Sequence, residues 1–190
     1  INAATSGGLI QTADTSGILQ LQTAGVTGIT IDASQNVTLA KGLTVGATAA
    51  PAFSAYSSTN QTALASSAIV KATINTELYD TNSNFDNVTN YRFTPTVAGY
   101  YQVNASIGFN GTLTSALARI YVNGAVAFTG TYSTAVTNNQ INSIVSCLVL
   151  LNGSTDYIEL YGQATTSAGT FTMLGTASVT FFQAVMVRSA

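Results

Sequence analysis

The sequence has no histidine, a single cysteine and very few charged residues. Only 6% of its 190 residues are charged, and five basic and seven acidic side chains give a net charge of −2. Because a globular domain typically has about 25% charged residues, this surface must be built mainly from Thr, Ser, Asn, Gln and Gly. The scarcity of Lys and Arg argues against electrostatic binding of nucleic acid and against docking on an anionic membrane.

The single cysteine excludes an intrachain disulfide. Cys147 lies in the apolar run SIVSCLVLL, where we expect a small buried side chain, because a reactive thiol needs electropositive neighbours. Without His, and with only Asp156 and Glu159 as nearby acids on one predicted strand, we find no hydrolase or lyase machinery. Asp80 and Asp86 flank a predicted loop, where they either form turns or contact calcium or a sugar. We predict no enzyme activity, cofactor or metal.

Long apolar runs are also missing. None approaches the ~20 residues of a membrane-spanning helix, and no signal peptide is visible. The chain begins with Ile1 instead of Met, so we expect a fragment or a processed product.

Aromatic residues are absent from residues 1–50, whereas all 8 Phe and all 9 Tyr lie from Phe53 onward. The first fifty residues contain very short alternating pieces, such as ITI and VTL, separated by Gly and Asn. This pattern is typical of short strands with one apolar face. Chains much below ~60 residues bury too little surface to fold alone. We expect a β-rich fibre shaft or linker over 1–50, whose apolar faces need a cover, and a head domain over 51–190.

The head is predicted to be all-β. Stretches such as AFSAYS, GYYQVNASIGF and ASVTFFQAVMV are separated by turns rich in Gly, Pro and Asn, and no window has convincing helical periodicity. Asn123-Gly124 is the strongest short hairpin signal, and Asn152-Gly153 predicts a second turn of this kind. Many short strands with such turns indicate a sandwich or a barrel.

Two predicted strands, SIVSCLVLL and SVTFFQAVMV, are apolar on both faces. The polar face of GYYQVNASIGF, by contrast, is expected in water. A soluble sandwich does not leave an apolar outer face in water, so we expect one sheet to be buried against sister subunits. A covering loop or an aggregation-prone strand is the alternative. The residues of these strands expected in the core or at the trimer interface are Ile144, Val145, Cys147, Leu148, Val149, Leu150, Phe181, Phe182, Val185 and Met186.

Several stretches resemble strands of the complement C1q / tumour necrosis factor-like globular head. They are PAFSAYSSTNQT, ELYDTNSNFDNVTNYRFTPTVAGYYQVNASIGF, IYVNGAVAF and TDYIELYG, and the match covers most of residues 51–190. Its most specific part is the spacing of Phe93, Gly99 and Tyr101. The resemblance implies a ten-stranded jelly-roll sandwich that forms a tight homotrimer, with both two-faced strands in the sheet facing the threefold axis. Val103 and Ala105 stand where the family usually has aromatics, and no metal site is carried over.

The stretch LQLQTAGVTGITIDASQNVTLAKGLTVGA resembles linker and shaft segments of bacteriophage tail fibres, which commonly precede a C-terminal trimeric head. In an intertwined trimer, two further copies of the segment would cover each short apolar face. The leading hypothesis is therefore a tail-fibre tip on the virion exterior that binds a host cell-surface glycan or protein and joins upstream virion proteins. A decoration or head fibre, and a secreted complement-like ligand, remain alternatives, and a polysaccharide-degrading enzyme is the least favoured.

The direction of the predicted strands suggests where a receptor would bind. Strands alternate in direction, so GQATTSAGTF and GTYSTAVTNNQ are expected to be loops at the end of the head farthest from the shaft. Their polar, nearly uncharged side chains suit contacts with sugars. The candidate receptor-binding residues are Tyr132, Thr134, Asn138, Asn139, Gln163, Thr165, Thr166 and Ser167.

Overall fold

The computed structural model describes residues 16–40 and 50–190, except for the side chains of Thr23 and residues 135–138. The chain divides into two units, residues 1–46 and residues 47–190, and each is described by itself here. Within the described ranges every regular element is a β-strand.

The first unit contains a small antiparallel sheet in the order β1-β2-β3. Its strands are β1 (Leu19–Thr23), β2 (Val26–Ile31) and β3 (Val37–Leu39). Ala24 and Gly25 both have positive φ, as a two-residue hairpin turn of the favoured type requires. No side chain described between residues 16 and 40 is buried. This sheet therefore has apolar side chains but no core of its own.

The second unit, which we call the head, contains eleven strands. They are β4 (Ala52–Tyr56), β5 (Gln61–Leu64), β6 (Ile69–Lys71), β7 (Thr76–Asp80), β8 (Phe85–Asp86), β9 (Arg92–Phe93), β10 (Gly99–Val122), β11 (Ala125–Thr129), β12 (Ser133–Leu151), β13 (Ile158–Met173) and β14 (Phe181–Ser189).

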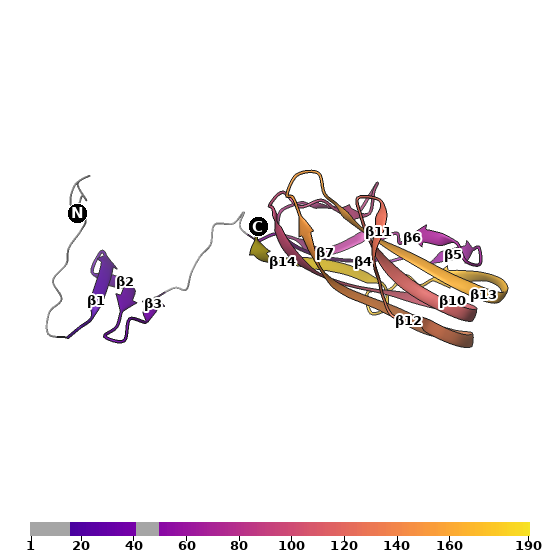
Figure 1. Ribbon diagram of the computed structural model, residues 1–190, viewed down its shortest axis with the longest axis horizontal. Helices are drawn as coiled ribbons and strands as arrows, with labels where there is room; N and C mark the ends of the chain where they lie inside the picture. The colour runs from indigo at the N-terminus through magenta and orange to yellow at the C-terminus, as the bar shows by residue number, and fades with distance from the viewer. Residues whose placement is uncertain (1–15, 41–49) are drawn as a thin grey trace. The chain divides into compact units, whose positions relative to one another are not determined.

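These strands form one continuous hydrogen-bonded network that folds into two sheets sharing β10. The first sheet has the order β7-β4-β14-β10-β12, in which β14 pairs with residues 99–106 of β10 and β12 with residues 99–116. The second sheet has the order β8-β9-β13-β10-β11, with β5 and β6 also paired to β13; here β13 pairs with residues 109–122 of β10 and β11 with residues 119–122. In Figure 1 the long strands β10, β12 and β13 extend together away from the C-terminus of β14.

A bend at Gly111 lets β10 cross from one sheet to the other. Gly111 has a φ of 146°, and the register of both neighbouring strands shifts beside it. Both ends of β10 lie at the same end of the head, because Asn123 and Asn152 each make a hydrogen bond of 2.9 Å with Asp156. The strand thus doubles back on itself, and the two sheets become layers of a sandwich.

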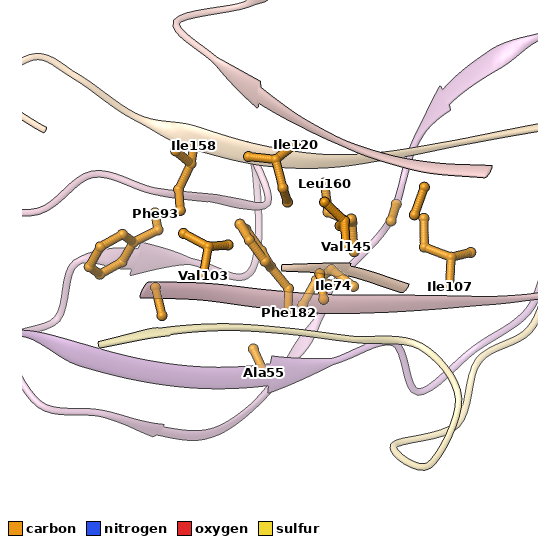
Figure 2. Close-up of a cluster of buried hydrophobic side chains, with 14 of the residues drawn as sticks. Ala55, Ile74, Phe93, Val103, Ile107, Ile120, Val145, Ile158, Leu160 and Phe182 are labelled. Carbon is orange, nitrogen blue, oxygen red and sulfur yellow. The ribbon is translucent and has the colours of Figure 1, made fainter. Parts of the chain in front are cut away.

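The core lies between the two layers. The ring of Phe53 in the first sheet stacks on Phe85 and on Phe93 of the second, with centroid distances of 4.6 Å in each case. Figure 2 shows Ile120, Ile158 and Leu160 pointing from the second sheet toward Val103 and Phe182 of the first. All five of these side chains are fully buried. The prediction of an all-β, jelly-roll-like sandwich is confirmed.

The two predicted Asn-Gly turns have different structures. Asn123 and Gly124 have φ values of 52° and 78° and form the tight β10–β11 hairpin, as predicted. Asn152-Gly153 instead opens the six-residue connection from β12 in the first sheet to β13 in the second. There the Asn152 side-chain oxygen accepts hydrogen bonds from the N–H groups of Ser154, Thr155 and Asp156. The hairpin prediction was wrong here, because the side chain of Asn152 organises a longer loop.

Candidate functional site

The first sheet packs one face on the core, and its other face, which we call the open face, lies uncovered. In β12 the side chains alternate between these faces. The core side is formed by Val145, Cys147, Val149 and Leu151, which are all buried. On the open face, Ile144, Leu148 and Leu150 are 56%, 52% and 53% exposed. The structure thus shows the two apolar sides that the sequence predicts for this strand.

The strand β14, which lies on the other side of β10 from β12, adds further apolar residues to the open face. Val185 and Val187 are both exposed, whereas Phe182 is buried in the core, and Phe181 and Met186 are half-buried. The register shifts by one residue near Val187, which alters the alternation at the end of the strand. This bulge was not predicted, because it depends on how β14 pairs with β10.

A polar band runs across the open face. Gln102 donates a hydrogen bond of 3.0 Å to the Ser146 hydroxyl, which donates one of 2.8 Å to the side-chain oxygen of Asn104. In the strand register Gln102 stands opposite both Leu148 and Val185. The polar face expected in water and the apolar face expected against sister subunits are therefore the same face.

The open face also holds a depression of about 110 Å³. Its lining residues are Phe53, Tyr79, Gln102, Asn104, Gln183, Ala184 and Val185. Ligand pockets for small molecules typically measure ~300–1,000 Å³, so this depression is too small for such a ligand.

The sequence candidates for receptor binding lie mostly in strands. Thr134 and Asn139 belong to β12, and Gln163, Thr165, Thr166 and Ser167 belong to β13. The prediction of loops was wrong, because β12 and β13 continue beside β10 through its bend. Thr134 and Thr165 even flank the same residue of β10, Ser115. The side chain of Asn138 lies outside the described residues.

The turn at Ser66 and Ser67 forms hydrogen bonds with several of these candidates, which no local sequence pattern indicates. Gln163 donates to the carbonyl oxygen of Ser67 at 2.8 Å, and the Thr165 hydroxyl lies 3.0 Å from that of Ser67. The N–H group of Thr166 donates to the Ser66 hydroxyl at 3.0 Å. These polar groups support the fold of the head as well as facing its surface.

Tyr132 is 62% exposed but lies beside Ile144. The N–H group of the preceding Thr131 donates to the carbonyl oxygen of Ile144 at 2.8 Å. The ring is therefore at the edge where β12 meets the segment after β11. The sequence predicts a loop at the end of the head for Tyr132, and the residue does lie in the short connection between β11 and β12.

Both loop aspartates hold turns. The Asp80 carboxylate accepts from the N–H groups of Asn82 and Phe85, and that of Asp86 accepts from Val88, Thr89 and Asn90. These bonds, chiefly the one from Thr89, lower the pKa of Asp86 to about 2. In residues 16–40 and 50–190, no group of three potential metal-binding side chains is found. The turn-forming interpretation accounts for both residues.

Cys147 is buried in the core, and burial raises the pKa of its thiol to about 11. A thiol in this state is a poor nucleophile, because the reactive species is the thiolate.

No model of a known protein family matches the chain, and no curated protein is similar to it in sequence. Its fold is similar to that of murine APRIL, whose structure at pH 5.0 aligns with a TM-score of 0.56 at 9% identity over 73% of this chain and 99% of that one. The globular domain of zebrafish complement 1qA aligns with a TM-score of 0.51 at 15% identity, over 74% of this chain and 98% of that one. The head has a C1q/TNF-like jelly-roll fold. At these identities the likeness concerns the fold alone.

None of the described segments forms a helix of the length and apolar character needed to cross a membrane.

Proposed function

We propose that this protein is the tip of a bacteriophage tail fibre, a homotrimeric module that attaches the virion to the surface of its host cell. One observation carries the proposal: the open face exposes Ile144, Leu148 and Leu150 of β12 by more than half, and Val185 of β14 is exposed across the polar band. Large apolar patches on soluble monomers are uncommon and usually mark an interface. A second and third copy of the chain are the partners that the jelly-roll fold favours.

The sheet of the first unit supports the same assembly. Its exposed Leu21, Val26 and Val37 have no core to join within one chain. Three copies wound together would cover them, as a shaft of residues 1–50 leading to a head of residues 51–190. This organisation is part of the proposal.

Receptor contact is assigned to the end of the head opposite Pro51, where β10 bends at Gly111. The candidates there are Thr134, Asn138, Asn139, Gln163, Thr165, Thr166 and Ser167, with Tyr132 on the adjacent edge. Hydroxyl and amide groups suit a cell-surface glycan or a polar protein surface. Three copies around one axis would convert weak single-site binding into useful avidity. The proposed role is binding and not catalysis.

Competition for host cells tests this function. Purified protein should bind bacteria that the phage infects and reduce phage adsorption, whereas a variant that remains a trimer but carries Thr134→Ala and Asn139→Ala should compete less well. Asn82→Ala, in the loop near Pro51, is the matched control and should compete like the wild type. Protein that neither binds these cells nor blocks adsorption would contradict the proposal.

A second candidate is a secreted TNF- or C1q-like ligand, which the fold likeness to murine APRIL and zebrafish complement 1qA favours. The location of the protein distinguishes the two candidate functions. Antibodies to the head should label the fibres of purified virions if the first candidate holds.

A further inference from the structure

The outward face of the second sheet gathers basic and aromatic side chains. Three of the five basic residues in the chain, Lys71, Arg92 and Arg119, lie on it. In the strand register, Tyr161 stands between Lys71 and Arg119, and Glu159 stands between Arg92 and Tyr121. In a chain with so few charges, this concentration on one face is unusual and calls for a physical explanation.

Two of the three cations have partners within the chain. Lys71 Nζ lies 2.6 Å from a Glu159 carboxylate oxygen and donates to the carbonyl oxygen of Asn90 at 3.2 Å. The Glu159 side chain is only 6% exposed, so each charge neutralises the other in a protected environment. Arg92 lies over the ring of Tyr157, 4.5 Å from its centroid.

Arg119 differs from both. Within the described part of the chain, its guanidinium makes no hydrogen bond or ion pair, and its Nη1 atom is shielded from solvent without a partner. Nearly all buried N–H groups in native proteins are satisfied, because an unpaired one is costly. Arg119 as a whole is only half-buried, so an acceptor supplied from outside the chain has access to this side chain.

Two tyrosines lie next to Arg119 in the strand register. The rings of Tyr121 and Tyr161 lie 4.1 Å apart between centroids and are tilted by 31°. Both side chains are half-buried, so part of each ring faces solvent. Tyr161 is the cross-strand neighbour of Arg119, and Tyr121 follows it two positions along β10. The two rings are thus packed on each other, beside a cation that has no partner in the described part of the chain.

We propose that this face binds an acidic saccharide, with Arg119 donating to its carboxylate and Tyr121 and Tyr161 packing against its sugar ring. A planar guanidinium matches a carboxylate in geometry and charge. A sugar ring presents C–H groups that pack on an aromatic face, while the Tyr121 hydroxyl bonds to its polar groups. The Tyr161 hydroxyl already donates to Glu159 at 3.4 Å, and Lys71 Nζ lies 5.7 Å from the centroid of its ring. The inference rests on the proposed function for its expectation that the ligand is a cell-surface glycan. It adds a second site and a ligand class to the end-of-head site.

Titration calorimetry with paired ligands tests the proposal on the intact protein. The probes are oligogalacturonate, a hyaluronan oligosaccharide and sialyllactose, each beside its methyl ester, which keeps the sugar but removes the negative charge. At least one acid should bind about tenfold or more tightly than its ester, as expected for a hydrogen bond between charged groups. Arg119→Gln should remove this preference and leave binding of the ester unchanged. Arg188→Gln makes the same charge change on β14 of the first sheet and should preserve the preference.

Each remaining outcome overturns the inference. Equal binding of acid and ester, or no binding of any acid, would show that Arg119 does not serve a carboxylate. Loss of the preference in Arg188→Gln as well would reveal a general charge effect. If the saccharides fail but the protein still blocks phage adsorption, the inference is wrong and the proposed function stands. If adsorption is not blocked while an acid binds through Arg119, the proposed function is wrong instead.

Discussion

Among single residues, Asp86 holds the turn between β8 and β9. Its carboxylate accepts four hydrogen bonds, which lower its pKa from 3.8 to about 2. Because the pKa is lower in the folded state, the stabilisation is complete above pH 3.8 and is lost as the pH falls toward 2. We expect the free energy of unfolding to decrease across this window, and to decrease less in Asp86→Asn. Denaturant titrations at several pH values measure both, and identical pH profiles would contradict the assignment.

The ion pair of Lys71 and Glu159 is the second prediction at this scale. Lys71→Met leaves a carboxylate of 6% side-chain exposure without its partner, which should cost about 3 kcal/mol of stability. Although burial opposes the charge on Lys71, Glu159 outweighs it and raises the pKa of the lysine. The stability from the pair is therefore present below pH 10.5 and is lost as the pH rises beyond it.

The control for this pair is Lys71→Met combined with Glu159→Leu. Replacing both partners removes the buried charge, so most of the lost stability should return in a denaturant titration. A double variant as unstable as Lys71→Met would mean that the lysine acts through its packing on Tyr161 and not through its charge.

At the scale of the element, substitutions on the two faces of β12 distinguish the folding of the head from the assembly of the trimer. Val149 is 6% exposed on the core side, so Val149→Asp buries an unpaired charge and should cost about 3–5 kcal/mol, a large part of the stability of a typical domain, and destabilise the head itself. Leu148 is its neighbour on the open face, and Leu148→Asp should leave each head folded but prevent the trimer. Circular dichroism and light scattering distinguish the two results. Leu148→Met, which stays apolar, should remain trimeric, and a trimeric Leu148→Asp would show that the open face is not the interface.

The same elements show what sequence can reveal. Alternation has a period of two, so the two faces of β12 follow from its residues alone. Pairing between distant strands does not follow in this way. The polar side of β10 and the apolar side of β12 form one face only because Gln102 stands opposite Leu148.

The candidate sites show the same limit. Residues 163–169 have the composition of a loop, yet they belong to a strand whose Thr166 bonds to Ser66, 100 residues away. The Arg119 site is not evident from the sequence, because Arg119 and Tyr121 lie on β10 and Tyr161 on the distant β13, and they form no local motif.

For the whole molecule, the lack of charge predicts how the trimer responds to salt. The exposed Ile144, Leu148, Leu150 and Val185 would be buried by association, and none of them is charged. Light scattering should give three times the 19.5 kDa chain mass, unchanged between about 0.05 and 1 M NaCl, because salt screens charges and does not weaken apolar contacts. Dissociation at high salt would point to an interface held by ion pairs, and a stable monomer at micromolar concentration would exclude the trimer.

The two units should depend on assembly to different degrees. The head has its own core, with Phe53, Phe93, Tyr101 and Phe182 fully buried, so a chain beginning at Pro51 should fold and form trimers without the first unit. Between residues 16 and 40 no described side chain is buried, and a sheet of three short strands is marginal in water. A peptide of residues 1–50 should therefore lack the circular dichroism of a β-sheet when alone. Subtracting the circular dichroism spectrum of the head from that of the full chain should leave a β-sheet signal only while the trimer is intact. A peptide that folds as a monomer would mean that the first unit needs no sister copies, and the intertwined shaft would have to be abandoned.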